Sequence, residues 1–186
     1  MKNIAIFASG SGTNAQAIAE YFSSHSQVKV DCILSNNPKA YVLERARNLN
    51  IPSFTFNRHT LYETDEILSL LQKRNIDLIV LAGFLWLVPQ NLLKNYTIIN
   101  IHPALLPKYG GKGMFGMKVH EAVVENHDSE SGITIHYVNE LYDEGQTIFQ
   151  AKCPVSSDDT PEMVASKVHA LEYEHFAKVI EQLLIK

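Results

Sequence analysis

Two polar side chains, Asn100 and His102, interrupt an otherwise apolar run that extends from Ile98 to Pro107. The run begins with β-branched residues, which is typical of a buried strand in a parallel sheet. Residues two apart on a strand point to the same side, so the amide and the imidazole are expected to face one spot. An amide that donates to a developing oxyanion, beside an imidazole that moves a proton, can carry out acyl transfer. The alternative is that both side chains only satisfy loop backbone groups at a strand end.

An acidic loop downstream offers a third group for this site. Asp143 lies in the segment 139–145, which follows a predicted strand expected to neighbour the strand of His102. A carboxylate delivered there would hold the imidazole and favour its charged form. The alternative is an acidic loop that is only solvated.

A glycine-rich turn near the N-terminus suits an anion. It follows a short apolar run and precedes a segment with helical spacing, and it consists of Gly10, Ser11, Gly12, Thr13 and Asn14. Glycines let backbone N–H groups approach an anion, and the N-terminus of the helix adds its dipole. Thr13 or Asn14 is expected to cap that helix and to contact the ligand.

The same turn fits a dinucleotide-binding fingerprint loosely, through the spacing of Gly10, Gly12 and Ala15. A nicotinamide enzyme usually places an acidic residue at the end of the second strand, for the ribose hydroxyls. Here the predicted second strand, residues 28–34, is followed by a serine and two asparagines. Phosphate binding is therefore favoured over dinucleotide binding, with a tight turn that binds no ligand as the remaining alternative.

Two further loops are candidates for ligand contact. The first follows the predicted fourth strand and forms an apolar rim of Leu85, Trp86, Leu87 and Val88. Such a rim can line the pocket of a flat aromatic ligand or can simply pack into the core. The second, residues 110–117, is rich in glycine, which predicts a mobile loop or a plain surface loop. Lys108 and Lys112 would draw an anionic substrate to it.

The order of the elements predicts an α/β fold with one doubly wound, mostly parallel sheet. Apolar runs typical of strands are found at residues 3–8, 28–34, 53–56, 76–82, 98–102, 132–137 and 145–154. Because only a short loop separates them, the last two are expected to be antiparallel. Helical spacing is found at residues 15–22, 41–48, 62–74, around 92–93, and at 118–125 and 161–184. Thr60 and Glu63 resemble a capping box for the helix 62–74.

Composition excludes several classes of protein. The 186 residues are 46% hydrophobic and carry a net charge of −4, which predicts a globular domain and argues against a nucleic-acid partner. No apolar run reaches membrane-spanning length, and the N-terminus is a predicted strand, not a signal peptide. Cys32 and Cys153 lie in apolar runs and are expected to be reduced core thiols of a cytoplasmic protein.

The chain resembles the folate-dependent formyltransferases over nearly its whole length. The resemblance rests on residues 9–14, on Leu81-Ala82-Gly83-Phe84, on Asn100-Ile101-His102-Pro103-Ala104-Leu105-Leu106-Pro107, on the strand 132–137, and on Asp143 with Gly145. It implies formyl transfer from 10-formyltetrahydrofolate, with most similarity to members that formylate the glycine amine of 5-phosphoribosyl-glycinamide in purine (IMP) synthesis. It implies a Rossmann-like fold and no metal.

The resemblance also implies roles for individual residues. His102 is the proton-transfer group, Asn100 polarises the formyl oxygen, and Asp143 raises the affinity of the histidine for a proton. Substrate binding around the phosphate is implied for Gly10, Ser11, Gly12, Thr13, Asn14 and Glu174. Contact with 10-formyltetrahydrofolate is implied for Leu85, Trp86, Leu87, Val88, Asn100 and Arg58.

We expect one domain over residues 1–186, with a phosphate- and ribose-binding half at about 1–100 and a catalytic and folate-binding half at about 81–186. Small molecules are the expected partners, without nucleic acid or membrane, and the protein is expected to be a monomer or a weak homodimer. The alternatives are a formyltetrahydrofolate hydrolase or a methionyl-tRNA formyltransferase, which are disfavoured because each needs a further domain. A nicotinamide-dependent oxidoreductase and a metal-dependent hydrolase using His102, His136 and Asp143 are more distant alternatives.

Overall fold

The computed structural model describes residues 1–185. The elements are, in chain order, β1 (Lys2–Phe7), α1 (Thr13–Tyr21), β2 (Val28–Ser35), α2 (Val42–Asn48), β3 (Ser53–Thr55), α3 (Arg58–Tyr62), α4 (Glu66–Lys73), β4 (Leu78–Leu81), α5 (Gln90–Asn95), β5 (Thr97–His102), α6 (Met117–Glu125), β6 (Glu130–Tyr137), β7 (Thr147–Pro154) and α7 (Pro161–Leu184). This alternation of strands and helices is the one predicted from hydrophobic spacing.

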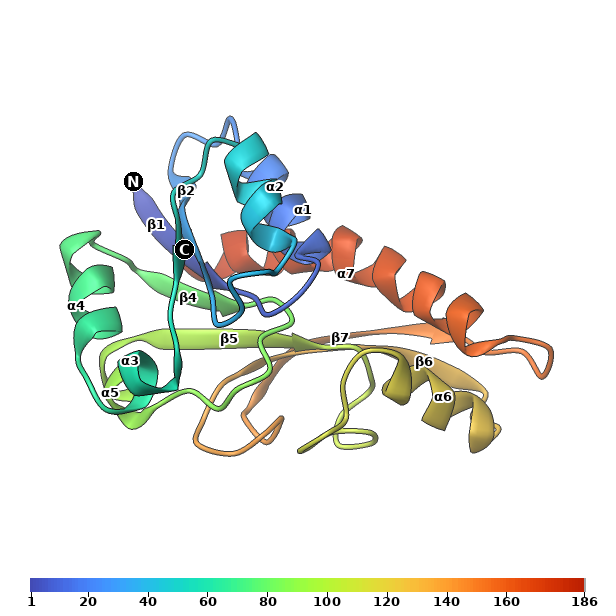
Figure 1. Cartoon of the computed structure of the whole chain (residues 1–186). Helices are drawn as coiled ribbons and strands as arrows, with labels where there is room; N and C mark the ends of the chain where they lie inside the picture. Colours follow the sequence, from blue (N-terminus) through green and yellow to red (C-terminus); the bar gives the residue numbers. More distant parts are fainter. Residues whose placement is uncertain (186) are drawn as a thin grey trace.

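One seven-stranded sheet runs through the molecule, in the order β3-β2-β1-β4-β5-β6-β7 (Figure 1). The first five strands in this order pair in parallel. β6 runs antiparallel to β5, and β7 runs antiparallel to β6. The predicted α/β class, a doubly wound and mostly parallel sheet with an antiparallel C-terminal strand and a long final helix, is therefore confirmed.

Helices cover both faces of the sheet, and each face has its own apolar core. One core contains buried residues of α1, α2, α6 and α7, including Ile18, Val42 and Phe176. The other contains buried residues of α3, α4 and α5, including Leu61 and Leu71. Figure 1 shows α3, α4 and α5 grouped together at one side of the molecule, away from α6. β4 and the last four residues of β1 contribute to both cores and are apolar on both faces, as their sequences predict.

The segment 62–74, predicted as one helix, is divided between α3 and α4. The capping box predicted from Thr60 and Glu63 is also wrong. Asn57 caps α3 instead: its side-chain oxygen accepts from the Thr60 N–H at 2.9 Å, and the Thr60 hydroxyl lies 3.4 Å from the Asn57 nitrogen. Thr60 is thus the third residue of a first turn, so the helix begins earlier than its apolar spacing suggests.

The order of the strands places a crevice between β1 and β4. The chain leaves β1 toward β2 on one side and later returns to β4 on the other side, so the loops after these strands diverge. In open α/β sheets, ligands bind at such a point, beyond the carboxyl ends of the strands. β5 pairs with β4 and ends at His102, so its end opens toward the same crevice.

Hydrogen bonds join the loops around this crevice. The Ser9 hydroxyl donates to Asn36 Oδ1 at 2.7 Å and accepts from the Leu85 N–H at 3.1 Å. The Ser9 N–H donates to the Gly83 carbonyl at 3.0 Å. The loops after β1, β2 and β4 are therefore tied together through one serine.

Both cysteines, Cys32 and Cys153, are free and buried, as predicted for core thiols. Among residues 1–185, no helix combines the length and the apolar character needed to cross a membrane.

Gly145 precedes β7 at a place where the backbone of the Asp143 loop presses on β6. A Cβ atom at Gly145 would lie 1.6 Å from the carbonyl oxygen of Tyr137. We expect Gly145→Ala to lower the free energy of unfolding by about 1–3 kcal/mol, because backbone atoms would have to move. Urea denaturation measures this loss. Gly10→Ala is the control, since its Cβ would meet no atom within 4 Å, and an equal loss in both variants would contradict the explanation.

Candidate active site

A cavity of about 630 Å³ lies at the carboxyl ends of β1, β4 and β5. Its walls are the turn after β1, the loop after β4, the end of β5, the loop before α6, and residues of α6 and α7. This size is typical of a small-molecule site. Asn100, His102 and Asp143 all line it.

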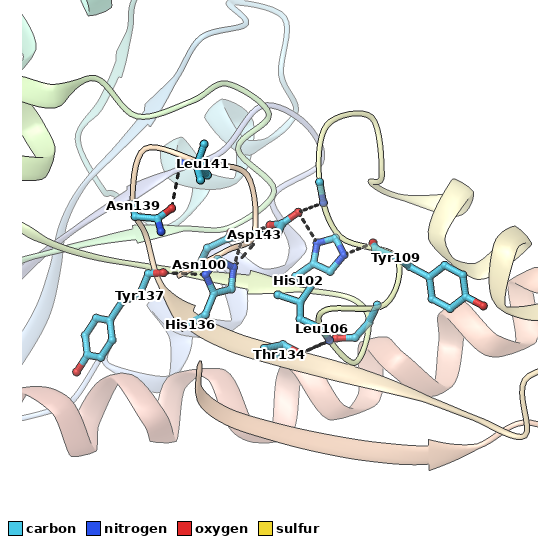
Figure 2. Close-up of polar contacts among 12 residues, drawn as sticks. Asn100, His102, Leu106, Tyr109, Thr134, His136, Tyr137, Asn139, Leu141 and Asp143 are labelled. Carbon is cyan, nitrogen blue, oxygen red and sulfur yellow. Dashed lines mark hydrogen bonds and ion pairs between the residues drawn. The ribbon is translucent and has the colours of Figure 1, made fainter. Parts of the chain in front are cut away.

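These three side chains converge on one point of the cavity wall (Figure 2). Asn100 and His102 lie on β5, and Asp143 lies in the loop between β6 and β7. Asp143 Oδ1 is 3.4 Å from Asn100 Nδ2, and Asp143 Oδ2 is 3.5 Å from His102 Nδ1. The fold thus brings together an amide, an imidazole and a carboxylate that are up to 43 residues apart in the chain.

The two ring nitrogens of His102 have different surroundings. Nε2 is 2.7 Å from the carbonyl oxygen of Tyr109, and a carbonyl only accepts, so this nitrogen carries a hydrogen. Nδ1 faces Asp143 at a distance longer than the usual N–H···O bond. Nδ1 is therefore the nitrogen that remains available to a ligand in the cavity.

Burial lowers the pKa of His102 below its ordinary value, although the Asp143 carboxylate and the Tyr109 carbonyl act in the opposite direction. The side chain is only 5% exposed. The Asp143 carboxylate does favour the charged imidazole, as predicted. Burial outweighs the carboxylate, so the neutral ring, which can accept a proton, is the favoured form at pH 7.

Contacts with other segments hold Asp143 as a carboxylate. Oδ2 accepts from the Gly111 N–H at 3.0 Å, and Oδ1 lies 3.6 Å from His136 Nε2. Burial by itself would raise the pKa of Asp143, but the contacts with His136, His102 and the Gly111 N–H together hold this pKa below its usual value. Asp143 is consequently ionised throughout the neutral range.

His136 is part of this group, although sequence reasoning considered it only as a ligand in the metal alternative. It lies opposite Asn100 in the pairing of β5 with β6 and is 2% exposed. Nδ1 is 2.8 Å from the Tyr137 carbonyl and so carries a hydrogen, which leaves Nε2 to accept from Asn100 Nδ2 at 3.2 Å. This bond orients the Asn100 amide. In the sequence, the available signal for His136 was a histidine inside a strand that is otherwise buried.

The turn Gly10–Asn14 lines the cavity over its whole length. Gly12 has φ +74°, and a Cβ there would lie 2.3 Å from a Val42 methyl carbon, so only glycine fits. Gly12 is the N-cap residue of α1, and no side chain caps this helix. The prediction that Thr13 or Asn14 caps α1 is therefore wrong. The uncapped N–H groups are the donors that an anion requires.

Glu172, and not the predicted Glu174, faces the cavity from α7. Glu172 Oε2 accepts from Asn14 Nδ2 at 2.9 Å and lies 2.8 Å from His169 Nδ1. The Glu174 side chain is 58% exposed and approaches Lys178 at 3.9 Å. Two residues along a helix rotate a side chain by about 200°. The expectation for Glu174 is corrected for this reason.

The apolar rim after β4 contributes less than predicted. Leu85 lines the cavity and is 42% exposed. Trp86 and Val88 pack into the core beneath α3, α4 and α5, and Leu87 does not line the cavity either. Arg58 also lies outside the cavity wall, with its guanidinium carbon 4.6 Å from the centre of the Trp86 ring. Of the residues predicted to contact folate through this rim, only Leu85 therefore has its side chain in the cavity wall.

Of the two lysines predicted to draw an anion, Lys112 lines the cavity. Lys108 does not, because it is paired with Asp128 at 3.1 Å.

Two further histidines in the cavity wall were missed. His120 of α6 is 2% exposed, and its Nδ1 has no hydrogen-bond partner among the described residues. Its ring lies 6.3 Å from that of His169 of α7. Burial, aided by His169, lowers the pKa of His120 to about 4, whereas the bond to Glu172 raises the pKa of His169. In the sequence, the only signal for these two residues was a histidine on the inward face of a predicted helix.

The sequence from residue 2 to residue 180 matches the Formyl transferase family. The match covers most of the chain, so this protein belongs to that family.

Two similar relatives carry the same name. The chain is 39% identical to the chloroplastic phosphoribosylglycinamide formyltransferase of Arabidopsis thaliana, over 96% of this chain and 64% of the relative. It is 37% identical to the phosphoribosylglycinamide formyltransferase of Haemophilus influenzae, over 97% of this chain and 86% of the relative. The chain thus spans less than two thirds of the length of the plant protein.

The fold is also similar to a solved structure, that of glycinamide ribonucleotide transformylase 1 from Geobacillus kaustophilus. The TM-score is 0.88 at 37% identity, and the alignment covers 99% of both chains.

The buried His120 makes stability depend on pH. An unfolded histidine binds a proton below about pH 6.5, whereas His120 in the folded state does so only below about 4. Between these values the unfolded state holds more protons, so the folded state loses stability as the pH falls. We expect this group to cost about 2 kcal/mol at pH 5.

Urea denaturation at pH 7 and pH 5 tests this expectation. His120→Gln, which cannot titrate, should lose less stability between the two pH values than the unchanged protein. The same loss in both proteins would show that His120 does not carry the effect.

Proposed function

We propose that this protein transfers the formyl group of 10-formyltetrahydrofolate to the glycine amine of 5-phosphoribosyl-glycinamide, a step of purine (IMP) biosynthesis. The observation that carries the proposal is the meeting of Asn100, His102 and Asp143 in one cavity with the turn Gly10–Asn14. The names of the similar plant and bacterial proteins support this choice of acceptor. Membership of the family supports a folate-derived formyl donor.

The acceptor is placed by its phosphate. The uncapped N-terminus of α1 offers backbone N–H groups and a favourable dipole, and Lys112 adds a positive charge in the same cavity. Asn14 and Glu172 stand beside this position and present groups that can bind hydroxyls of a ribose. The glycine amine then extends along the cavity toward His102.

The donor is placed by the loops after β4 and β5. We place the pterin ring against Leu85, because this residue lines the cavity while Trp86 turns into the core. Arg58 has no role in this arrangement, since it stacks on Trp86 and does not line the cavity. 10-Formyltetrahydrofolate is a co-substrate here, and the chemistry needs no metal.

In the reaction, the amine nitrogen attacks the formyl carbon, a C–N bond forms, and the carbonyl oxygen becomes an oxyanion. The bond from the formyl carbon to N10 of the folate then breaks. The amine must lose one proton and N10 must gain one, so the transfer is balanced without an external acid. His102 Nδ1 is the nitrogen that can carry this proton, and Asp143 Oδ2 stabilises the imidazolium while it exists.

Asn100 is the hydrogen-bond donor to the oxyanion. Its amide hydrogens point to His136 Nε2 at 3.2 Å and to Asp143 Oδ1 at 3.4 Å. The second bond is longer and therefore weaker, so the hydrogen in it is the one that a formyl oxygen can take over. His136 holds the amide in place during this exchange.

A formyl-transfer assay with three acceptors tests the function. The protein is mixed with 10-formyltetrahydrofolate and with 5-phosphoribosyl-glycinamide, methionyl-tRNA, or water alone, and the products are identified by mass spectrometry. We expect the formylated glycinamide and tetrahydrofolate in the first mixture only. Formate release without an acceptor would indicate a hydrolase and would overturn the proposal, as would formylation of the tRNA alone.

His102→Gln removes the group that carries the proton. We expect kcat to fall by roughly 10²–10⁴-fold, while the dissociation constant of a non-reactive folate analogue, measured by fluorescence, stays within about twofold. His59→Gln is the matched control, because that histidine is 68% exposed in its side chain and, within residues 1–185, forms its one side-chain ion pair with Glu63. A kcat within tenfold of the unchanged protein would remove His102 from its role.

A further inference from the structure

One short segment, residues 109–111, contacts both ends of the His102–Asp143 pair. The Tyr109 carbonyl accepts from His102 Nε2 at 2.7 Å. Two residues on, the Gly111 N–H donates at 3.0 Å to Asp143 Oδ2, the oxygen that faces His102 Nδ1. The backbone of this segment therefore sets the positions of both groups. Figure 2 shows Tyr109 next to His102, with its aromatic ring pointing away from Asp143.

The backbone of this segment has an unusual conformation. Tyr109 has φ +56°, a left-handed conformation that is unfavourable for a tyrosine, and Gly111 has φ +96°. On one side the segment borders the active-site cavity through Gly111, and on the other side Tyr109 borders a second cavity of about 360 Å³. Tyr109 also packs against the apolar core, so the segment is held on one face and borders a cavity at each end.

Asp128 anchors the segment from outside the active site. It lies in the turn between α6 and β6, and its side chain is 18% exposed. Oδ2 accepts from the Tyr109 hydroxyl at 2.8 Å, and Oδ1 accepts from Lys108 Nζ at 3.1 Å. One carboxylate therefore holds the side chains of two successive residues, directly before the backbone that contacts His102 and Asp143.

We propose that Asp128 is a positioning residue for His102, acting through Tyr109. The carboxylate fixes the Tyr109 side chain, so that the Tyr109 carbonyl stays on Nε2 and the Gly111 N–H stays on Asp143. Nδ1 is thereby kept for proton transfer. The inference rests on the proposed formyl transfer, because it gives His102 the role described above.

The consequence is a change in the affinity of His102 for a proton. The Tyr109 carbonyl favours the protonated ring, and so does an Asp143 carboxylate that is held close to Nδ1. Loosening the segment weakens both contacts, so the affinity falls. The other titratable groups around His102 are His136 of β6, Glu172 of α7 and His120 of α6.

Three variants separate positioning from general loss of structure. Asp128→Ala removes both bonds of the anchor. Tyr109→Phe removes only the hydroxyl, keeps the ring and the backbone carbonyl, and remains informative if Asp128→Ala does not fold. Asp128→Asn keeps an acceptor oxygen for the tyrosine and should rescue most of the effect.

Glu130→Gln is the matched control. Glu130 lies two residues from Asp128 and pairs with Lys152 at 2.7 Å, so the control breaks a comparable surface ion pair. It borders the same second cavity but makes no contact with residues 109–111 that is recorded among the described hydrogen bonds and ion pairs.

Two measurements are made on each protein. NMR titration follows the His102 ring, which is assigned by the loss of its signal in His102→Gln. Steady-state formyl transfer gives kcat and KM separately. For Asp128→Ala and Tyr109→Phe, we expect the His102 midpoint to move to lower pH and kcat to fall by about 10-fold, with KM within about twofold, because a displaced catalytic group slows the chemical step. Glu130→Gln should show neither change.

An unchanged His102 midpoint in both folded variants would overturn the proposal, as would an equal fall of kcat in Glu130→Gln. If the unchanged protein does not formylate 5-phosphoribosyl-glycinamide, the proposed function fails. The titration of the ring still decides separately whether Asp128 positions His102.

Discussion

The site depends on a single buried imidazole that is held between two oxygens. Removing His102 from water disfavours its charged form, and the Tyr109 carbonyl and the Asp143 carboxylate oppose this effect without overcoming it. A histidine in this balance is neutral at rest and can still hold a proton briefly during transfer. The Tyr109 carbonyl and the Asp143 carboxylate lie on different loops. Their combined effect on the His102 proton therefore depends on the positions of both loops.

The topology explains how loops from distant parts of the chain reach one histidine. β5 ends at the crevice between β1 and β4, so His102 lines the same cavity as the glycine-rich turn after the first strand. β6 then runs back along β5, which places His136 beside Asn100 and lets the following loop return Asp143 to the cavity. A parallel strand at this position would need a long crossover and could not return a loop directly.

Family resemblance and local geometry contribute differently to the assignment. The resemblance placed a substrate-contacting acid on the last helix, but the helix turns Glu174 outward and Glu172 inward. It also placed Trp86 against a ligand, whereas the core beneath α3, α4 and α5 takes up that side chain. A motif identifies which kinds of residue are present, and the phase of each element decides which of them reach the cavity.

The sequence by itself determined the class of fold, the strand that carries Asn100 and His102, and the glycine-rich turn before α1, because hydrophobic spacing and glycine placement are local properties. The bounds of α3 and α4 were missed, since the Asn57 cap competes with apolar spacing. Only the tertiary structure decided that burial outweighs Asp143, that Glu172 replaces Glu174, and that Tyr109 contacts His102. Each of these three features depends on contacts between segments far apart in the chain. The spacing of residues along the sequence carries no information about desolvation or about side-chain direction at such contacts.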